Sequence, residues 1–224
     1  MKVSLEQTEL FQVEITKNQH WGERWALSNG WELVAGVDEV GRGCLAGPVV
    51  AAAVILPFNH GIIGLKDSKI LSRAKREKLF GEIIKKGCCA SSSVSNSRID
   101  RINILRATME AMARSIVKLC RKMGRSPECI LIDGLQVPGR ELLGMDVRCI
   151  PVRHGDCLSE NIAAASILAK VVRDGMMRRY ELMYSGYGFS QHKGYGTRRH
   201  YMALKKLGPC PIHRLTFSDV VSGR

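Results

Sequence analysis

The amino-acid sequence predicts an α/β domain, and three observations carry that prediction. Short apolar stretches rich in β-branched residues alternate with segments whose apolar residues recur every three or four positions. The longer helical segments gather toward the C-terminus. The 224 residues fit one domain, residues 31–224, preceded by a polar and partly helical appendage over residues 1–30. With 45% apolar and 25% charged residues, the composition is that of a globular protein and excludes a mostly disordered chain.

Two strands open the domain. The apolar run Leu33-Val34-Ala35-Gly36-Val37 predicts a buried strand that ends at Asp38-Glu39, where Gly41-Arg42-Gly43 forces a turn. The β-branched run from Val49 to Leu56 predicts the second strand, which Pro57 closes. A glycine-rich loop therefore joins the two strands.

A helix, a weaker strand and a long helix follow. Ser72 is a suitable N-cap for a helix over residues 73–86, and residues 88–94 predict a weaker strand. From Arg98 the apolar residues alternate in spacings of three and four, which predicts one buried stripe on a helix that Gly124 ends. The stripe consists of Ile102, Leu105, Met109, Met112, Ile116, Leu119 and Met123.

The second half of the chain continues the alternation. Cys129-Ile130-Leu131-Ile132 predicts a short strand that ends at Asp133-Gly134. The remaining elements are a strand and two helices, over residues 147–152, 161–183 and 197–207. The first of these helices begins with Ala163-Ala164-Ala165-Ser166, which is small enough for another backbone to pack closely.

The net charge of the chain narrows the range of possible partners. Lys and Arg number 34 against 21 Asp and Glu, a formal net charge of +13 that attracts polyanions, with nucleic acid the first candidate. No signal peptide or membrane-spanning stretch is expected. The eight cysteines show no C-x-x-C spacing, so they predict reduced thiols in a cytoplasmic protein and disfavour a zinc site.

Acidic residues follow three of the predicted strands. Asp38 and Glu39 end the first strand, Asp133 ends the strand at 129–132, and Asp156 follows the strand at 147–152. The carboxyl ends of strands form the functional edge of an open α/β sheet. Carboxylates gathered there repel one another unless cations bind, and such oxygen ligands suit Mg²⁺ or Mn²⁺. One such acid alone is more often a turn or cap residue, so the joint pattern carries the prediction.

The Gly41-Arg42-Gly43 turn is a weaker signal. Its glycines would let the backbone approach a ligand closely, although a plain tight turn explains the same residues. The pattern is not a dinucleotide fingerprint, because position 46 is Ala, and no Gly-Lys-Ser/Thr follows as in a P-loop. A nucleotide cofactor is therefore not expected.

The C-terminal region concentrates basic residues. Ten Lys or Arg fall between residues 170 and 214, against the two acids Asp174 and Glu181, with tyrosines interleaved. Charge for phosphates and rings for sugars or bases suit a nucleic-acid track. A solvated helix face with half-buried tyrosines is the alternative for most of these residues.

Taken together, these motifs resemble the ribonuclease HII family from about Leu33 to Val220. The resemblance implies an RNase H-like fold, a central mixed β-sheet flanked by helices, with a helical C-terminal region from about residue 175. The motifs that carry it are Gly36-Val37-Asp38-Glu39-Val40-Gly41-Arg42-Gly43, Leu45-Ala46-Gly47-Pro48-Val49-Val50-Ala51, Asp67-Ser68-Lys69, Ile132-Asp133-Gly134, Ala163 to Lys170, Arg173-Asp174 and His192 to Thr197.

The resemblance implies four catalytic, metal-binding carboxylates: Asp38, Glu39, Asp133 and Asp156. The fourth departs from the family pattern, which usually has Lys-Gly-Asp or Lys-Ala-Asp where this chain has His154-Gly155-Asp156. Asp174 competes for that role, but Asp156 is favoured because it follows a strand and precedes the alanine-rich helix. Cys44 replaces a proline common in the family.

The implied activity is an endonuclease that uses two divalent ions, Mn²⁺ or Mg²⁺, to cut the RNA strand of RNA–DNA hybrids. Incision at single ribonucleotides embedded in duplex DNA is included, with 5′-phosphate and 3′-hydroxyl products. The resemblance gives recognition of the 2′-hydroxyl to Gly41, Arg42, Gly43 and Tyr195. Contacts to phosphates are expected from Lys69, Ser166 and Lys170.

Two alternatives stay open. A non-catalytic hybrid-binding protein could keep this fold, but a pure binder gains nothing from acids that face a phosphate chain. The sister type, ribonuclease HIII, usually has Glu as its fourth acid and carries a larger N-terminal domain. Partners are expected to be RNA–DNA hybrid and ribonucleotide-containing DNA, bound by a monomer without a membrane, and a sliding clamp stays an open possibility.

Overall fold

The computed structural model describes residues 21–66 and 68–221. Its centre is a five-stranded sheet in the order β3-β2-β1-β4-β5. β1 pairs antiparallel with β2, and β2 antiparallel with β3, whereas β1, β4 and β5 run parallel to one another. The strands are β1 (Val34–Val40), β2 (Val49–Ile55), β3 (Cys88–Val94), β4 (Cys129–Asp133) and β5 (Arg148–Val152). The predicted α/β class with a central mixed sheet is confirmed.

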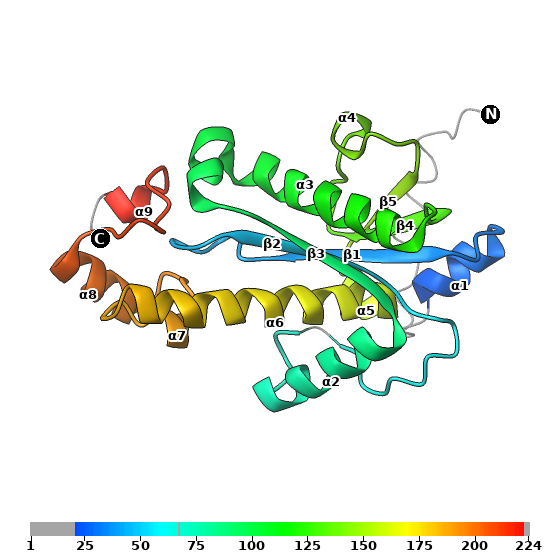
Figure 1. The fold of residues 1–224 in the computed structure, drawn as a ribbon, viewed down its shortest axis with the longest axis horizontal. Coiled ribbons are helices and arrows are strands. Elements are labelled where there is room, and N and C mark those ends of the chain that lie inside the picture. Colours follow the sequence, from blue (N-terminus) through cyan, green and yellow to red (C-terminus); the bar gives the residue numbers. More distant parts are fainter. Residues whose placement is uncertain (1–20, 67, 222–224) are drawn as a thin grey trace.

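Helices cover both faces of the sheet, with α3 on one side and α2 and α6 on the other (Figure 1). Alternate residues of β2 serve the two cores: Val49 and Ala51 pack toward α3, Val50 and Ala52 toward α2 and α6. The helices are α1 (Trp21–Ser28), α2 (Arg73–Lys86), α3 (Asn96–Met123), α4 (Arg140–Leu143), α5 (Gly155–Leu158), α6 (Glu160–Met183), α7 (Phe189–His192), α8 (Arg198–Leu207) and α9 (Ser218–Val221).

The first strand runs further than the sequence indicates. The prediction ended it at Asp38-Glu39, but β1 continues to Val40, and Asp38 and Glu39 pair with Ala52 and Ala51 of β2. The partner strand supplies small side chains at these positions, so the ladder continues through both acids. Asp38 and Glu39 are therefore held in the sheet itself and not in the following turn.

The long helix α3 is not the single helix that the apolar stripe predicts. Asn103 has φ 66 and ψ 166, which interrupts the helix near its start. The side-chain oxygen of Asn103 accepts a hydrogen bond from the backbone N–H of Arg106 at 3.0 Å, so it caps the longer second part. A local side-chain cap thus overrides the helical period at this position. Gly124 ends the helix in the left-handed conformation, as predicted.

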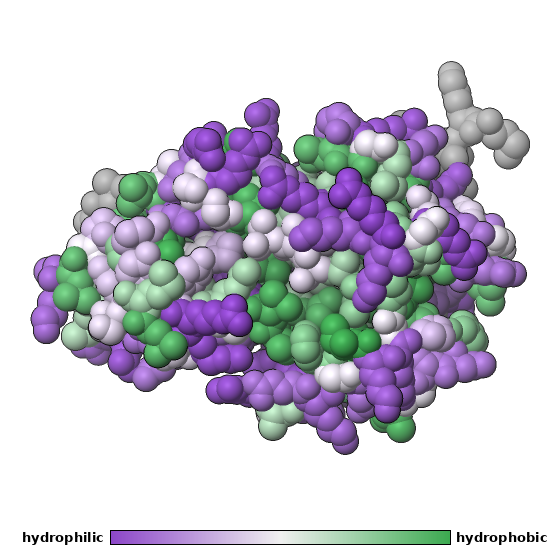
Figure 2. All heavy atoms as spheres, viewed as in Figure 1, coloured by the Kyte–Doolittle hydropathy of each residue, from purple (hydrophilic) through white to green (hydrophobic). Residues whose placement is uncertain are grey.

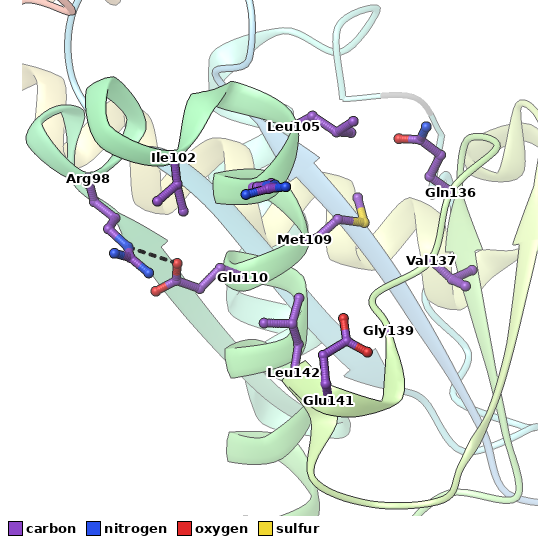
Figure 3. Close-up of a pocket in the computed structure, with 11 residues that line it drawn as sticks. Arg98, Ile102, Leu105, Met109, Glu110, Gln136, Val137, Gly139, Glu141 and Leu142 are labelled. Atoms are coloured by element: carbon purple, nitrogen blue, oxygen red, sulfur yellow. Dashed lines mark hydrogen bonds and ion pairs between the residues drawn. The ribbon is translucent and has the colours of Figure 1, made fainter.

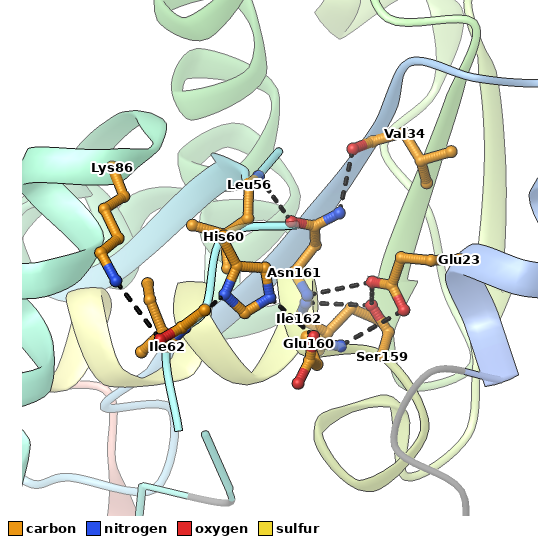
Figure 4. A network of polar contacts seen from close by, with 11 residues as sticks. Glu23, Val34, Leu56, His60, Ile62, Lys86, Ser159, Glu160, Asn161 and Ile162 are labelled. Atoms are coloured by element: carbon orange, nitrogen blue, oxygen red, sulfur yellow. Dashed lines mark hydrogen bonds and ion pairs between the residues drawn. The ribbon is translucent and has the colours of Figure 1, made fainter. Parts of the chain in front are cut away.

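The N-terminal end of α6 is anchored by a polar network (Figure 4). Asn161 donates to the carbonyl of Val34 at 3.1 Å and accepts from the N–H of Leu56 at 2.8 Å, which ties α6 to β1 and to the residue after β2. Glu23 of α1 accepts from the Asn161 N–H at 3.0 Å. At Gly36 a Cβ would lie 2.1 Å from the backbone of Asn161, so β1 and α6 approach as closely as glycine allows.

Shorter helices surround this core. α1 confirms a helix in the polar N-terminal stretch, and residues 1–20 of that stretch lie outside the described residues. The short helices α4, α5, α7 and α9 were not predicted. Hydrophilic side chains cover much of the face seen in Figure 2, with a band of hydrophobic residues near its middle. Within the described residues, no helix is both long and apolar enough to cross a membrane.

Candidate active site

Three neighbouring parallel strands deliver acidic side chains to one edge of the sheet. Val37 of β1 pairs with Ile132 of β4, so Asp38 and Asp133 come next in adjacent strands. Asp156 lies on α5, which begins shortly after β5, the strand beside β4. We call Asp38, Glu39, Asp133 and Asp156 the carboxylate cluster, and its charges act on one another as described below.

Asp38 is the most buried member, with 6% of its surface exposed. Its side chain accepts hydrogen bonds from the N–H of Glu39 at 2.6 Å and from the hydroxyl of Ser166. Burial, followed by the charges of Glu39 and Asp133, raises the pKa of Asp38 well above its usual range, and the two hydrogen bonds oppose that rise. Ser166 in turn bonds to Ser68 at 2.9 Å, so its position under Asp38 is fixed.

Asp133 ends β4 and connects the cluster to Asp156. It accepts a hydrogen bond from the N–H of Gly155 at 2.7 Å, which ties it to the first turn of α5. Burial raises the pKa of Asp133; the Gly155 bond lowers it, the charges of Asp156 and Glu39 raise it, and Lys69 lowers it. Asp156 and Lys69 therefore both lie within electrostatic reach of Asp133.

Asp174, the competing fourth acid, is placed differently. It lies in the interior of α6, and the ammonium of Lys170 bonds to it at 2.8 Å. Its charge is met by this partner one turn away, whereas Asp156 adds repulsion to Asp133. This arrangement favours Asp156 over Asp174 as the fourth member. The same ion pair engages Lys170, one of the predicted phosphate contacts.

The side chains of the carboxylate cluster fit a divalent metal by their chemistry and not by a preformed geometry. Among residues 21–66 and 68–221, no three His, Cys, Asp or Glu side chains are gathered as a ready-made metal site. The donor set nevertheless consists of carboxylate oxygens, and burial, followed by repulsion from neighbouring carboxylates, raises the pKa of Asp38 and Asp133. A hard divalent cation would offset that repulsion, so the chemistry of these residues fits Mg²⁺ or Mn²⁺.

Two buried arginines bond to different parts of the segment between β1 and β2, Arg214 to its first turn and Arg173 to its end. Arg173 and Arg214, here called the arginine pair, both have 0% of their surface exposed. Arg214 donates to the carbonyls of Gly41 and Arg42 at 2.6 and 2.7 Å. Gly41 has φ 95, and a Cβ there would lie 2.2 Å from Nε of Arg173. Glycine is therefore required at position 41 by conformation and by space.

Tyr195 lies against the same loop. An isolated bridge pairs Tyr195 with Cys44, and the N–H of Leu45 donates to the carbonyl of Gly194 at 2.8 Å. The tyrosine is 39% exposed, and burial of the remainder raises the pKa of its hydroxyl, as do the charge of Cys44 and a hydrogen bond with its thiol. The structure thus brings the predicted 2′-hydroxyl contacts, Tyr195 and residues 41–43, side by side.

The arginine pair is the part of the site that sequence reasoning missed. Both arginines belong to the basic C-terminal stretch, whose charges suggested a surface track for nucleic acid. Their acceptors are carbonyls of residues 41–48 and Lys193, and no sequence pattern marks a carbonyl as the partner of a distant arginine. The Arg173-Asp174 motif was the only signal nearby.

A groove elsewhere in the molecule is separate from this site. It measures about 660 Å³ and lies between α3 and the segment from Gln136 to Leu142 (Figure 3). Apolar side chains and the Arg98–Glu110 ion pair line it, and none of the carboxylate cluster does. The groove and the carboxylate cluster are therefore separate parts of the molecule.

A mixed sheet that carries carboxylates at the ends of its parallel strands, beside a glycine-rich loop, defines a nuclease of the RNase H-like class. The family model described as ribonuclease HII matches residues 35–220, and this chain belongs to the ribonuclease HII family. It is a ribonuclease H.

Relatives and solved structures agree. The chain is 53% identical over 200 residues to the ribonuclease HII of Endomicrobium trichonymphae, covering 88% of this chain and 91% of that protein. It is 49% identical over 196 residues to that of Ruminiclostridium cellulolyticum, covering 87% and 73%. The RNase HII in the PCNA complex from Archaeoglobus fulgidus superposes with a TM-score of 0.70 at 27% identity, covering 86% of this chain and 97% of that chain.

Proposed function

We propose that this ribonuclease H is a divalent-metal-dependent endonuclease that cuts the RNA strand of RNA–DNA hybrids and incises duplex DNA at single ribonucleotides. The observation that carries the proposal is the carboxylate cluster, which β1, β4 and the start of α5 bring to one edge of the sheet, where burial and then the charges of neighbouring acids raise the pKa of Asp38 and Asp133. The products are a 5′-phosphate and a 3′-hydroxyl.

The cluster would hold two divalent ions, with Asp38, Glu39, Asp133 and Asp156 as ligands. When bound, such ions activate a water and offset the charge that develops on the leaving oxygen. The protein's own residues set the ligands in place: the hydroxyl of Ser166 and the Glu39 N–H orient Asp38, and the Gly155 N–H orients Asp133.

Substrate recognition is proposed for the loop beside the cluster. Residues 41–43 and Tyr195 form one surface, and they would contact the 2′-hydroxyl and the sugar that carries it. Lys69, which acts electrostatically on Asp133, would bind a nearby phosphate. Lys170 and Ser166 complete the proposed phosphate contacts, with Lys170 oriented by Asp174.

The surroundings of the reaction belong to the same proposal. None of the cysteines, all of which lie in the described residues, forms a disulfide, which suits a reducing compartment such as the cytoplasm. Because the Archaeoglobus fulgidus relative is found in a complex with PCNA, we include a sliding clamp among the partners to be tested.

One assay tests the activity. The protein is incubated with duplex DNA that holds one ribonucleotide, with a long RNA–DNA hybrid and with an all-DNA duplex, each in Mg²⁺, Mn²⁺ or EDTA. We expect incision of the first two substrates only, and only with metal. Asp133→Asn should abolish incision, by at least about 1,000-fold, while binding and fold are retained. Cleavage of the all-DNA duplex, activity in EDTA, or wild-type rates for Asp133→Asn would refute the proposal.

A matched pair of variants tests the fourth carboxylate. Asp156→Asn should lower kcat by at least about 100-fold, because it removes a ligand from the cluster. The control is Asp174→Asn, which makes the same change on the neighbouring helix α6. Loss of the Asp174 carboxylate should change kcat by less than about threefold. Equal losses, or the reverse order, would move the assignment to Asp174.

A further inference from the structure

Arg214 is a buried cation that uses the backbone as its acceptor. Its guanidinium donates to Gly41 O at 2.6 Å, to Arg42 O at 2.7 Å and to Gly47 O at 2.9 and 3.1 Å. Within the described part of the chain, Arg214 forms no ion pair with a carboxylate. Asp100 acts on Arg214 only from beyond ion-pair distance, and a buried cation held mainly by carbonyls is costly, so its position calls for a role.

The hydrogen bonds of Arg214 fix which way the loop faces. All peptide bonds of the described residues are trans, so the carbonyl of each residue points opposite to the N–H of the next. Because the carbonyls of Gly41 and Arg42 point inward to Arg214, the N–H groups of Arg42 and Gly43 point outward. The outer face of the turn is therefore a pair of hydrogen-bond donors, suited to an oxygen of the ligand.

The neighbouring histidine links the same segment to Tyr195. Nε2 of His213 lies 3.0 Å from Nε2 of His200, and Nδ1 of His200 lies 2.9 Å from the carbonyl of Tyr195. The carbonyl of Tyr195 can only accept, so neutral His200 carries its proton on Nδ1 and accepts at Nε2, which assigns the His213 proton to Nε2. Nδ1 of His213 is then free to accept from the N–H of Cys210 at 2.8 Å. Nε2 of His200 then accepts a hydrogen bond from Nε2–H of His213, and Nδ1–H of His200 donates to the carbonyl of Tyr195. The two neutral rings therefore form a continuous chain of hydrogen bonds from His213 to Tyr195.

The segment that carries both residues is fixed from α3. The side-chain amide of Asn96 donates to the carbonyls of Pro211 and His213 at 3.0 Å. Asp100 accepts from the N–H groups of Leu215 and Thr216 at 3.0 and 3.1 Å. A segment held on both sides of Arg214 can serve as a rigid support.

We propose that Arg214 is a positioning residue for ribose selectivity, which turns the N–H groups of Arg42 and Gly43 toward the 2′-oxygen and, with the His213–His200 pair, holds that turn in register with Tyr195. The inference rests on the proposed function and extends it from the contacts themselves to what orients them. Arg214 touches no substrate in this account and acts only through the loop.

The test compares Arg214→Lys with Arg173→Lys. Both arginines are fully buried, but Arg173 binds the carbonyls of Ala46, Pro48 and Lys193 and neither Gly41 nor Arg42. For each variant, kcat and KM are measured on the duplex with one ribonucleotide, together with the Ki of an all-DNA duplex as competitor. The ratio of Ki to KM reports selectivity for the ribose, and thermal melting reports the fold.

We expect Arg214→Lys to raise KM by about tenfold or more, because one or two oriented hydrogen bonds to the ribose are lost. The Ki of the all-DNA duplex should change by less than about twofold. Arg173→Lys should lower the melting temperature while leaving the ratio within about twofold of wild type. An unchanged ratio for Arg214→Lys, or an equal fall for Arg173→Lys, overturns the inference and leaves the proposed function standing. A wild-type protein that fails to incise overturns both.

A second variant covers the case in which Arg214→Lys does not fold. In His213→Asn, the amide oxygen can still accept from the Cys210 N–H, but the hydrogen bond to His200 is lost. The selectivity ratio should fall by about threefold, since Arg214 stays in place and only the register with Tyr195 is loosened. A ratio equal to wild type in folded His213→Asn contradicts the proposed link.

Discussion

The carboxylate cluster, in which Asp38 is buried, and the fully buried arginine pair offset their charges in different ways. The arginine pair finds its acceptors within the chain, in carbonyls of residues 41–48 and Lys193. The carboxylate cluster has the ion pair of Glu39 with Arg42, the charge of Lys69 and a few N–H and hydroxyl donors. Burial, followed by the charges of neighbouring acids, still raises the pKa of Asp38 and Asp133. Carbonyls satisfy the arginine pair as folded, whereas a cation from solution would offset the repulsion that remains in the carboxylate cluster. This difference separates the part of the site that holds shape from the part that carries out chemistry.

The largest test of this difference is Asp38→Asn. Activity should fall by at least about 1,000-fold, or about 4 kcal/mol in the barrier, because a ligand is lost. Without metal, however, the free energy of unfolding should rise by about 1 kcal/mol, because a buried charge beside Glu39 and Asp133 is removed. Chemical denaturation in EDTA and kinetics in Mg²⁺ measure the two effects. A stability loss in EDTA would show that the cluster is already compensated within the chain.

The arginine pair should respond in the opposite way. Arg173→Met removes a buried charge but leaves the carbonyls of Ala46, Pro48 and Lys193 without their donor. The free energy of unfolding should fall by about 3 kcal/mol. Arg179→Met, an exposed site on the same helix, should change it by less than about 0.5 kcal/mol. Equal stabilities for the two variants in urea denaturation would contradict the compensation argued for the pair.

A smaller effect concerns the histidines beside the arginine pair. Burial lowers the pKa of His200 to about 4, and burial also lowers that of His213. The unfolded chain takes up protons below its ordinary pKa of about 6.5 while the folded protein does not, so this stability is present at pH 7 and is lost as the pH falls toward 4. Between pH 6.5 and 4.5 the free energy of unfolding should fall for both proteins. The fall should be smaller for His200→Asn than for wild type, by up to about 2 kcal/mol. Parallel pH profiles from urea denaturation would contradict this assignment.

The sequence was sufficient where structure depends on neighbouring residues. The strands over residues 49–55 and 88–94 and the helix capped by Ser72 follow from apolar period and cap chemistry, and they lie where predicted. The break at Asn103 escaped prediction because a side chain competes with the helical period there. The sequence also did not predict that β1 pairs antiparallel with β2 and parallel with β4, because strand order depends on contacts between distant segments.

In the candidate site, too, features set by nearby residues could be predicted and features set by contacts between distant segments could not. That Asp38 and Asp133 share an edge follows from strands that end in acids, and the structure places them in electrostatic contact. That Ser166 supports Asp38, or that Arg214 supports Gly41, could not be predicted, because each joins residues from separate elements. Motif spacing identifies residues that meet the substrate more readily than residues that hold them.

Arg214 lies far along the sequence from the loop that it supports, and this has a consequence for the newly synthesised protein. The strands that bear Asp38 and Asp133 emerge from the ribosome well before the segment that binds the carbonyls of Gly41 and Arg42. Until that segment docks against Asn96 and Asp100, the loop lacks its internal support. The order of synthesis therefore places the proposed support for ribose discrimination after the proposed catalytic acids, and a nascent chain should become selective only once the segment around Arg214 joins the fold.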